Sequence, residues 1–126
     1  MDYDMLRLAA DPVPHGTRFR KLYVCSPLSA PSWLEVNENM HNARYYAAAV
    51  GRYYGCRAVA PHAWLPLMLD DNDPAERALA LEFGLKLLET CDGLVVCGKR
   101  ISNGMRGEIE RALELGIPIL FLEDMR

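Results

Sequence analysis

The residues best suited to chemistry lie in a short stretch near the C-terminus, SNGMRGE, which runs from Ser102 to Glu108. Ser102 is a typical N-cap residue, and Gly104 and Gly107 allow a ligand to approach the backbone closely. The free amides of a helix start attract anions, and the positive end of the helix favours the ionised form of Glu108. An ionised carboxylate there could act as a nucleophile or stabilise a positive charge. The alternative is a glutamate that only stabilises the start of a helix.

His62 is a second candidate, because it follows a short apolar run and Pro61. An imidazole there could contact a ligand or act as a general acid. The alternative is a histidine that is hydrogen-bonded within a loop, since no second metal ligand lies at a suitable spacing from it. The acidic run at Asp70, Asp71 and Asp73 is typical of a solvated loop followed by a helix cap.

The elements that must position these residues alternate along the chain. Apolar runs predict four buried strands, over residues 21–25, 57–61, 93–98 and 117–122. The helical spacing of apolar residues predicts helices over 36–54, 74–90 and 102–115. This order predicts an α/β fold, with a parallel sheet of four or five strands between helices on both faces, as a three-layer sandwich. The breaker cluster DPVPHG predicts that residues 1–20 form an N-terminal arm before a domain over 21–126.

In such a sheet, ligands bind beyond the carboxyl ends of the strands. That rule selects the segments 26–29, 61–64 and 98–108. They supply the candidate ligand-binding residues Ser26, Pro27, Leu28, Ser29, His62, Gly98, Ser102, Gly104 and Met105. The hydroxyls of Ser26 and Ser29 would lie where a ribose or a phosphate binds, although serines are also common in ordinary turns.

Composition narrows the possible partners. The chain has 126 residues and a formal net charge of −3, which fits a single domain and disfavours binding to a nucleic-acid polymer. No apolar run is long enough to span a bilayer and the N-terminus does not resemble a signal peptide, so we expect a cytoplasmic protein without membrane contact. Cys25, Cys56, Cys91 and Cys97 lack CxxC spacing. We therefore expect reduced thiols, no metal site and no cofactor.

The sequence combines YVCS at 23–26, Asn39 with Ala43 and Tyr46, APH at 60–62, Cys91-Asp92, S-x-G-M-x-x-E at 102–108 and GIPI at 116–119. Over about residues 21–122, this combination resembles the nucleoside 2-deoxyribosyltransferase-like superfamily. It is closer to an uncharacterised branch of small bacterial and phage proteins, which is related to the deoxynucleoside 5′-monophosphate N-glycosidases. The resemblance implies a flavodoxin-like Rossmann fold, a nucleoside or nucleotide ligand, and a homo-oligomer of two or more subunits.

The resemblance also implies roles for individual residues. Glu108 would attack the anomeric carbon of a deoxyribose, and Tyr23 would support this glutamate as the second catalytic residue. Ser102 would face the 5′-hydroxyl or 5′-phosphate, and Asp92 would belong to the ligand-binding residues. The residues alone also fit a Tyr23 that only packs within its strand and an Asp92 that only forms a turn. An oxocarbenium-like transition state agrees with a carboxylate in this position, because the negative charge stabilises the developing positive charge.

Two departures from the family pattern leave the reaction open. The hydrolase pattern has an aspartate eight residues before Asp92, where this chain has Gly84, and Ser29 replaces a phosphate-binding arginine. The first hypothesis is N-glycosidic cleavage or deoxyribosyl transfer through Glu108. The alternative is binding or sequestration of a nucleotide or nucleotide-derived signal molecule without cleavage, as in a phage-encoded protein. A third hypothesis, an interaction-only protein, requires a filled pocket.

Overall fold

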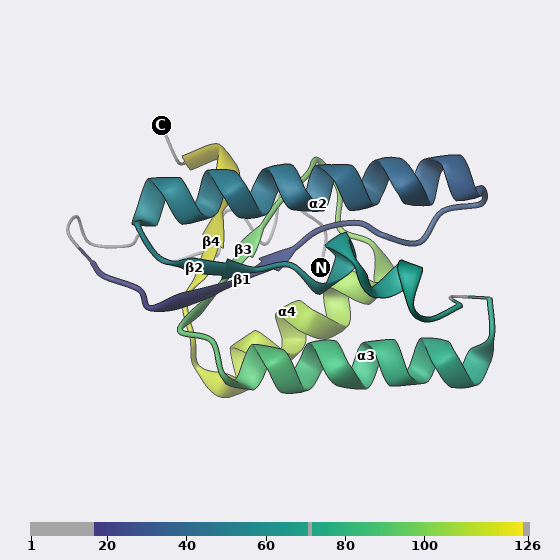
Figure 1. The fold of residues 1–126 in the computed structure, drawn as a ribbon. Coiled ribbons are helices and arrows are strands. Elements are labelled where there is room, and N and C mark those ends of the chain that lie inside the picture. The colour runs from purple at the N-terminus through teal and green to yellow at the C-terminus, as the bar shows by residue number, and fades with distance from the viewer. Residues whose placement is uncertain (1–16, 71, 125–126) are drawn as a thin grey trace.

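The centre of the structure is a parallel sheet of four strands (Figure 1), seen in a computed structural model that describes residues 17–70 and 72–124. The strands are β1 (Lys21–Cys25), β2 (Arg57–Val59), β3 (Gly93–Val96) and β4 (Ile119–Phe121). Their order in the sheet is β2-β1-β3-β4. The predicted α/β fold with a parallel, Rossmann-like sheet is confirmed.

Helices cover both faces of this sheet (Figure 1). The long helix α2 (Trp33–Tyr54) lies on one face, and α3 (Pro74–Glu89) and α4 (Asn103–Leu115) lie together on the other. The three layers are those predicted from the alternation of apolar strands and amphipathic helices.

Local capping decides where the helices begin. The Ser32 hydroxyl accepts a hydrogen bond from the Glu35 amide at 3.2 Å, so α2 begins at Trp33 and not at the predicted residue 36. The Asp73 carboxylate accepts hydrogen bonds from two amides of the first turn, and α3 begins at Pro74 as predicted. A side-chain acceptor before the first turn satisfies amides that have no partner within the helix.

Three strands are shorter than predicted. β3 ends at Val96 and not at residue 98. In β2 and β4 the cause is proline, which has no amide hydrogen for a strand ladder. β2 ends at Val59, and Pro61 begins the short 3-10 helix η1 (Pro61–Ala63). β4 begins at Ile119, after Pro118, while the amide of Ile117 bonds to a carbonyl of α4 at 3.3 Å. The shortening of β2 brings His62 into η1.

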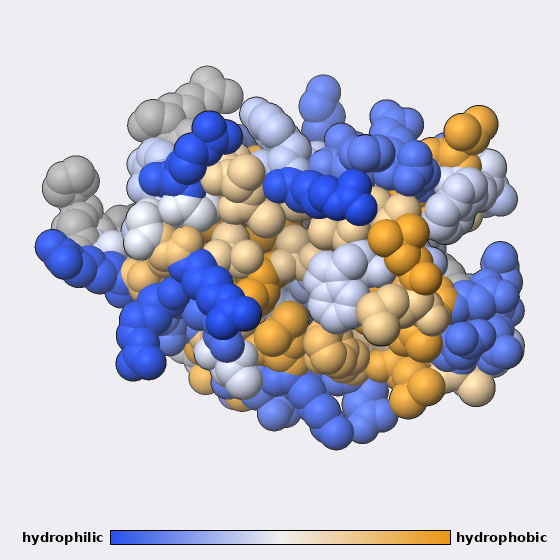
Figure 2. All heavy atoms as spheres, in the orientation of Figure 1, coloured by the Kyte–Doolittle hydropathy of each residue, from blue (hydrophilic) through white to orange (hydrophobic). Residues whose placement is uncertain are grey.

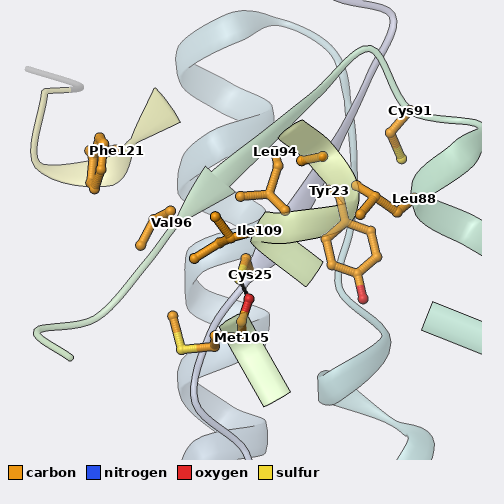
Figure 3. Packing of buried hydrophobic residues seen from close by; sticks show 10 residues of the cluster. Tyr23, Cys25, Leu88, Cys91, Leu94, Val96, Met105, Ile109 and Phe121 are labelled. Atoms are coloured by element: carbon orange, nitrogen blue, oxygen red, sulfur yellow. Dashed lines mark hydrogen bonds between the residues drawn. The ribbon is translucent and has the colours of Figure 1, made fainter. Parts of the chain in front are cut away.

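Alternate side chains of β1 enter two different apolar cores. Leu22 and Val24 pack on the α2 side, whereas Tyr23 and Cys25 pack on the side of α3 and α4. Figure 3 shows the second core, in which the Tyr23 hydroxyl points away from the labelled apolar side chains. The period of two in a strand thus delivers a phenol and a thiol to the face that α4 covers.

The sheet has a topological switch point between β1 and β3. The chain passes from β1 to β2 on one side and then crosses back to β3 on the other side of β1. Crossovers that leave in opposite directions open a crevice at the carboxyl ends of the two central strands. The fold therefore places a candidate site beyond Cys25 and Val96.

The predicted N-terminal arm lies largely outside the described residues, which begin at Thr17. Phe19 packs in the core on the α2 side, and the Arg20 carbonyl accepts a hydrogen bond from the Arg57 amide at 3.2 Å. Residues 17–20 therefore contact the body of the domain. In the described part of the chain, no helix combines the length and the apolar character that a membrane crossing needs.

Candidate active site

Glu108 lies on the buried side of α4, in the second turn after the Ser102 N-cap. The Ser102 hydroxyl accepts a hydrogen bond from the Met105 amide, and Met105 and Ile109 anchor the same side of α4 in the core. The Glu108 residue is only 5% exposed. A carboxylate is rarely buried to this extent unless it has partners or a function, so its surroundings decide its role.

Three side chains surround the Glu108 carboxylate. The Tyr23 hydroxyl donates a hydrogen bond to Oε2. The Cys25 thiol lies 3.8 Å from Oε1, and His62 Nε2 lies 3.9 Å from the same oxygen. One oxygen is thus fixed by the phenol, while the other lies between a thiol and an imidazole.

Burial controls the ionisation of this cluster. It raises the pKa of Glu108 above the ordinary glutamate value, and His62, Tyr23 and Cys25 act in the opposite direction. Burial first, and then the charge of Glu108, raises the pKa of Tyr23 and of Cys25 well above their ordinary values. Tyr23 and Cys25 therefore keep their protons at neutral pH and act as donors to the carboxylate.

At Gly84 the helix α3 lies close to this cluster. A Cβ atom at Gly84 would lie 2.9 Å from the Tyr23 hydroxyl oxygen and 3.8 Å from Glu108 Oε2. The first distance is shorter than ordinary van der Waals contact, so only a glycine leaves room for the hydroxyl in its observed place. The position that departs from the hydrolase pattern thus has a packing reason in this chain.

A cleft of about 600 Å³ opens beside Glu108. Its lining comes from β1 and the following loop, from η1 and Leu65, from α3, and from the loop and first turns that lead to Glu108 in α4. Its lining includes Tyr23, Leu28, Ser29, His62, Arg77, Leu81, Gly84, Leu85, Arg100, Ser102, Gly104, Gly107 and Glu108. Figure 2 shows apolar residues over η1 and the following short 3-10 helix η2 (Leu65–Leu67), and over the adjacent side of α3. The volume lies within the range of small-molecule sites.

Most of the residues predicted from the strand ends lie together in this cleft. Leu28, Ser29, His62, Ser102 and Gly104 line it along with Tyr23 and Glu108. Their convergence follows from the switch point, because the segments after β1, β2 and β3 meet at one edge of the sheet.

Other predicted residues lie behind the lining. Ser26 is 1% exposed; its carbonyl accepts a hydrogen bond from His62, while its buried hydroxyl has no hydrogen-bond partner among the described residues. Gly98 has a φ of +94°, and Pro27 packs against it. Met105 is fully buried, and its sulfur accepts a hydrogen bond from the Ser102 amide. These residues shape the loops and do not line the cleft.

Asp92 is not brought to the cleft. It precedes β3, and its carboxylate accepts hydrogen bonds from the amides of Arg20 and Lys21 at 2.7 and 3.2 Å. These bonds, made at the amino end of β1, lower the pKa of Asp92. The ligand-binding role that the resemblance implied is thus replaced by a structural one, since the amino and carboxyl ends of parallel strands lie at opposite edges of a sheet.

Of the lining residues of α3, the sequence singled out only Gly84. Arg77, Ala80, Leu81, Gly84 and Leu85 line the cleft from one side of the helix. Their spacing of three and four residues is a helical stripe, which was visible in the sequence, but α3 is apolar almost all round. Only the packing of α3 against α4 selects which stripe faces the cleft.

The fold and the site define a doubly wound α/β protein with a buried carboxylate at the switch point of its sheet. The chain belongs to the family described as Domain of unknown function (DUF7768), whose model matches residues 20–122. No curated protein matches the chain.

A solved structure, a 2-deoxyribosyltransferase from the psychrotolerant bacterium Bacillus psychrosaccharolyticus, is similar to the chain with 16% sequence identity and a TM-score of 0.60. The similarity covers 80% of this chain and 70% of that chain. It shows a shared fold. The bacterial and phage branch stays a prediction.

No group of three or more His, Cys, Asp or Glu side chains in the described residues is placed to hold a metal ion. The four cysteines are free, and three of them are buried. The side chains nearest to the Glu108 carboxylate are a phenol, a thiol and an imidazole.

We expect Gly84→Ala to destabilise the protein by roughly 1–3 kcal/mol, because the new methyl group must displace the Tyr23 hydroxyl. Inside a helix, alanine is otherwise favoured over glycine by about 1 kcal/mol. The control is Gly107→Ala on α4, where a Cβ has nothing within 4 Å and should stabilise. Thermal unfolding measures both. Equal increases in Tm for the two variants would show that the hydroxyl has room.

We expect Glu108→Gln to be more stable than the wild type at neutral pH, with a difference that shrinks on acidification. The pKa of Glu108 is raised in the folded state, so its carboxyl favours folding less as the pH rises above the ordinary glutamate value. Glutamine carries no charge at any pH. The measurement is Tm between pH 4 and pH 8, with Glu110→Gln, an exposed glutamate of α4, as control. A difference that does not depend on pH would contradict the burial argument.

Proposed function

We propose that this protein cleaves the N-glycosidic bond of a nucleoside or nucleotide, or transfers its deoxyribosyl group, with Glu108 as the nucleophile. The observation that carries the proposal is a nearly fully buried carboxylate that borders a cleft of about 600 Å³. The fold shared with a 2-deoxyribosyltransferase supports the same class of reaction.

The arrangement of the two carboxylate oxygens suits an attack on a sugar. Tyr23 donates its hydrogen bond to Oε2, which fixes the plane of the carboxylate. Oε1 then attacks the anomeric carbon, the bond to the base nitrogen breaks, and the base leaves with the electron pair and takes up a proton. Water or a second base then attacks the anomeric carbon, and the bond to Glu108 breaks with its electron pair returning to the carboxylate. The negative charge of Glu108 stabilises the oxocarbenium-like transition state of each step.

The lining of the cleft offers separate surroundings for the parts of a nucleotide. Leu65, Leu81 and Leu85 provide an apolar wall for a flat base. The Arg100 and Arg77 side chains line the same cleft and carry the positive charge that a 5′-phosphate requires. Ser102 and Gly104, at the start of α4, would face the 5′ end of the sugar. These charges support a nucleoside monophosphate over a nucleoside.

The direct test is incubation with a panel of ribo- and deoxyribonucleosides and their monophosphates, with free base measured by chromatography. We expect Glu108→Gln to lose at least about 10³-fold in kcat/KM, because an amide cannot form the glycosyl bond. Glu110→Gln, on the exposed side of α4, should keep full activity. Rapid quenching and mass spectrometry of the intact protein should show a deoxyribosyl adduct on the wild type and on Glu110→Gln, and none on Glu108→Gln. Full activity of Glu108→Gln would defeat the proposal.

A second candidate function is binding of a nucleotide or nucleotide-derived signal without cleavage. The observation that favours it is that Glu108 is the sole carboxylate in the described lining of the cleft, with Gly84 where the hydrolase pattern has an aspartate.

Binding without cleavage predicts a rise in Tm with ligand, recovery of the ligand intact, and binding that survives Glu108→Gln. We expect Arg100→Ala to abolish most of the preference for a monophosphate, about tenfold or more in Kd, in either function. The same Kd for nucleoside and monophosphate in the wild type would show that the arginines of the cleft do not bind a 5′-phosphate. A cytoplasmic location, a homo-oligomeric state and a phage origin stay predictions.

A further inference from the structure

His62 is held in one orientation by the end of β1. Its Nδ1 lies 2.8 Å from the carbonyl oxygen of Ser26, the first residue after the strand. A carbonyl oxygen can only accept a hydrogen bond, so Nδ1 carries the hydrogen. In a neutral imidazole the other nitrogen, Nε2, is then without a proton, and only the imidazolium has N–H groups at both positions.

The nitrogen that Ser26 leaves available faces the candidate nucleophile. Nε2 lies 3.9 Å from Glu108 Oε1, and the His62 side chain is only 16% exposed. A neutral ring in this orientation directs a lone pair at an ionised carboxylate. An imidazolium directs an N–H and a positive charge at it, in a place where solvent screens the attraction poorly.

The distance of 3.9 Å between His62 Nε2 and Glu108 Oε1 argues against an acid–base role for His62 on the opposite side of the sugar. In retaining glycosyl transfer the nucleophile and the acid–base group lie on opposite sides of the anomeric carbon, about 5–5.5 Å apart. At 3.9 Å from Oε1, Nε2 leaves no room for a sugar carbon between the two atoms. His62 therefore acts on the carboxylate and not on the leaving base.

We propose that His62 is a positioning residue: its imidazolium, anchored on the Ser26 carbonyl, keeps the buried Glu108 ionised. For the reaction rate the proposal rests on the proposed function, but the interaction itself belongs to the ligand-free protein. Among the groups that lower the pKa of Glu108 against the effect of burial, His62 has the largest influence.

Charged and titratable groups from each neighbouring element share these surroundings. They are Tyr23 and Cys25 of β1, Arg77 of α3, Arg100 of the loop before α4, and Arg44 of α2, which donates to the carbonyl of Ala63 beside His62. Among these groups only His62 can place a positive charge within 4 Å of Glu108 Oε1. A single substitution at His62 therefore removes this contact and leaves the arginines in place.

The test is the titration of Glu108 in the ligand-free protein, followed by NMR of carboxyl-¹³C-labelled glutamate. The Glu108 signal is assigned as the one that disappears in Glu108→Gln. In His62→Asn, the side-chain amide can still donate to the Ser26 carbonyl but carries no charge. We expect the Glu108 midpoint to move to higher pH in His62→Asn and not in His41→Asn, a change on α2 beside Arg44. If His62→Asn does not fold, His62→Gln is the second variant. An unmoved midpoint would overturn the proposal.

The rate gives an independent readout. If the protein cleaves nucleosides, the acidic limb of kcat/KM should move to higher pH in His62→Asn, with a loss of about tenfold at pH 6 that narrows at pH 8. A profile with an unchanged limb and a uniform loss would point to a merely structural role and contradict the proposal. Absence of turnover in the wild type would defeat the proposed function, while the shift of the NMR midpoint would still support the His62–Glu108 interaction.

Discussion

The hydrogen bond from Tyr23 to Glu108 is the interaction on which the site depends. A carboxylate buried between a sheet and a helix loses the hydration that stabilises its charge. A buried hydrogen-bond donor replaces part of that stabilisation. The donor must be buried too, and burial itself ensures that the phenol keeps its proton. The structure thus holds the ionisable carboxyl group of Glu108 in an apolar core at the edge of a cleft.

The rest of the fold brings Tyr23 and Glu108 together. The alternation of β1 delivers Tyr23 and Cys25 to one face, while Leu22 and Val24 hold the strand on the other. The Ser102 cap sets where α4 begins and thereby directs Glu108 toward that face. Close packing of α3 is possible because Gly84 has no side chain at the point of contact with the hydroxyl.

The site combines a buried carboxylate with surroundings that oppose its ionisation. Burial raises the pKa of Glu108, and the groups that counter burial come from β1 and η1. An enzyme that uses a buried nucleophile gains a stronger electrostatic effect on a positive transition state, because the low polarity that disfavours the charge also strengthens its attraction. A binding protein has less need of such an arrangement, since an ionised carboxylate would repel a phosphate. Arg77 and Arg100 line the same cleft, and their positive charges would offset such a repulsion.

The sequence by itself determined the order of strands and helices, the start of α3 at Pro74 and the closeness of Glu108 to a helix start, because these features depend on local periodicity and capping. It also selected the loop segments of the cleft, since parallel strands place their carboxyl ends at one edge. The tertiary structure alone decided that Asp92 bonds to the amides of Arg20 and Lys21 and that Gly84 lies against the Tyr23 hydroxyl. It alone brought His62, anchored on Ser26, to Glu108. These are contacts between residues far apart in the chain, and no local pattern encodes the packing of an almost uniformly apolar α3.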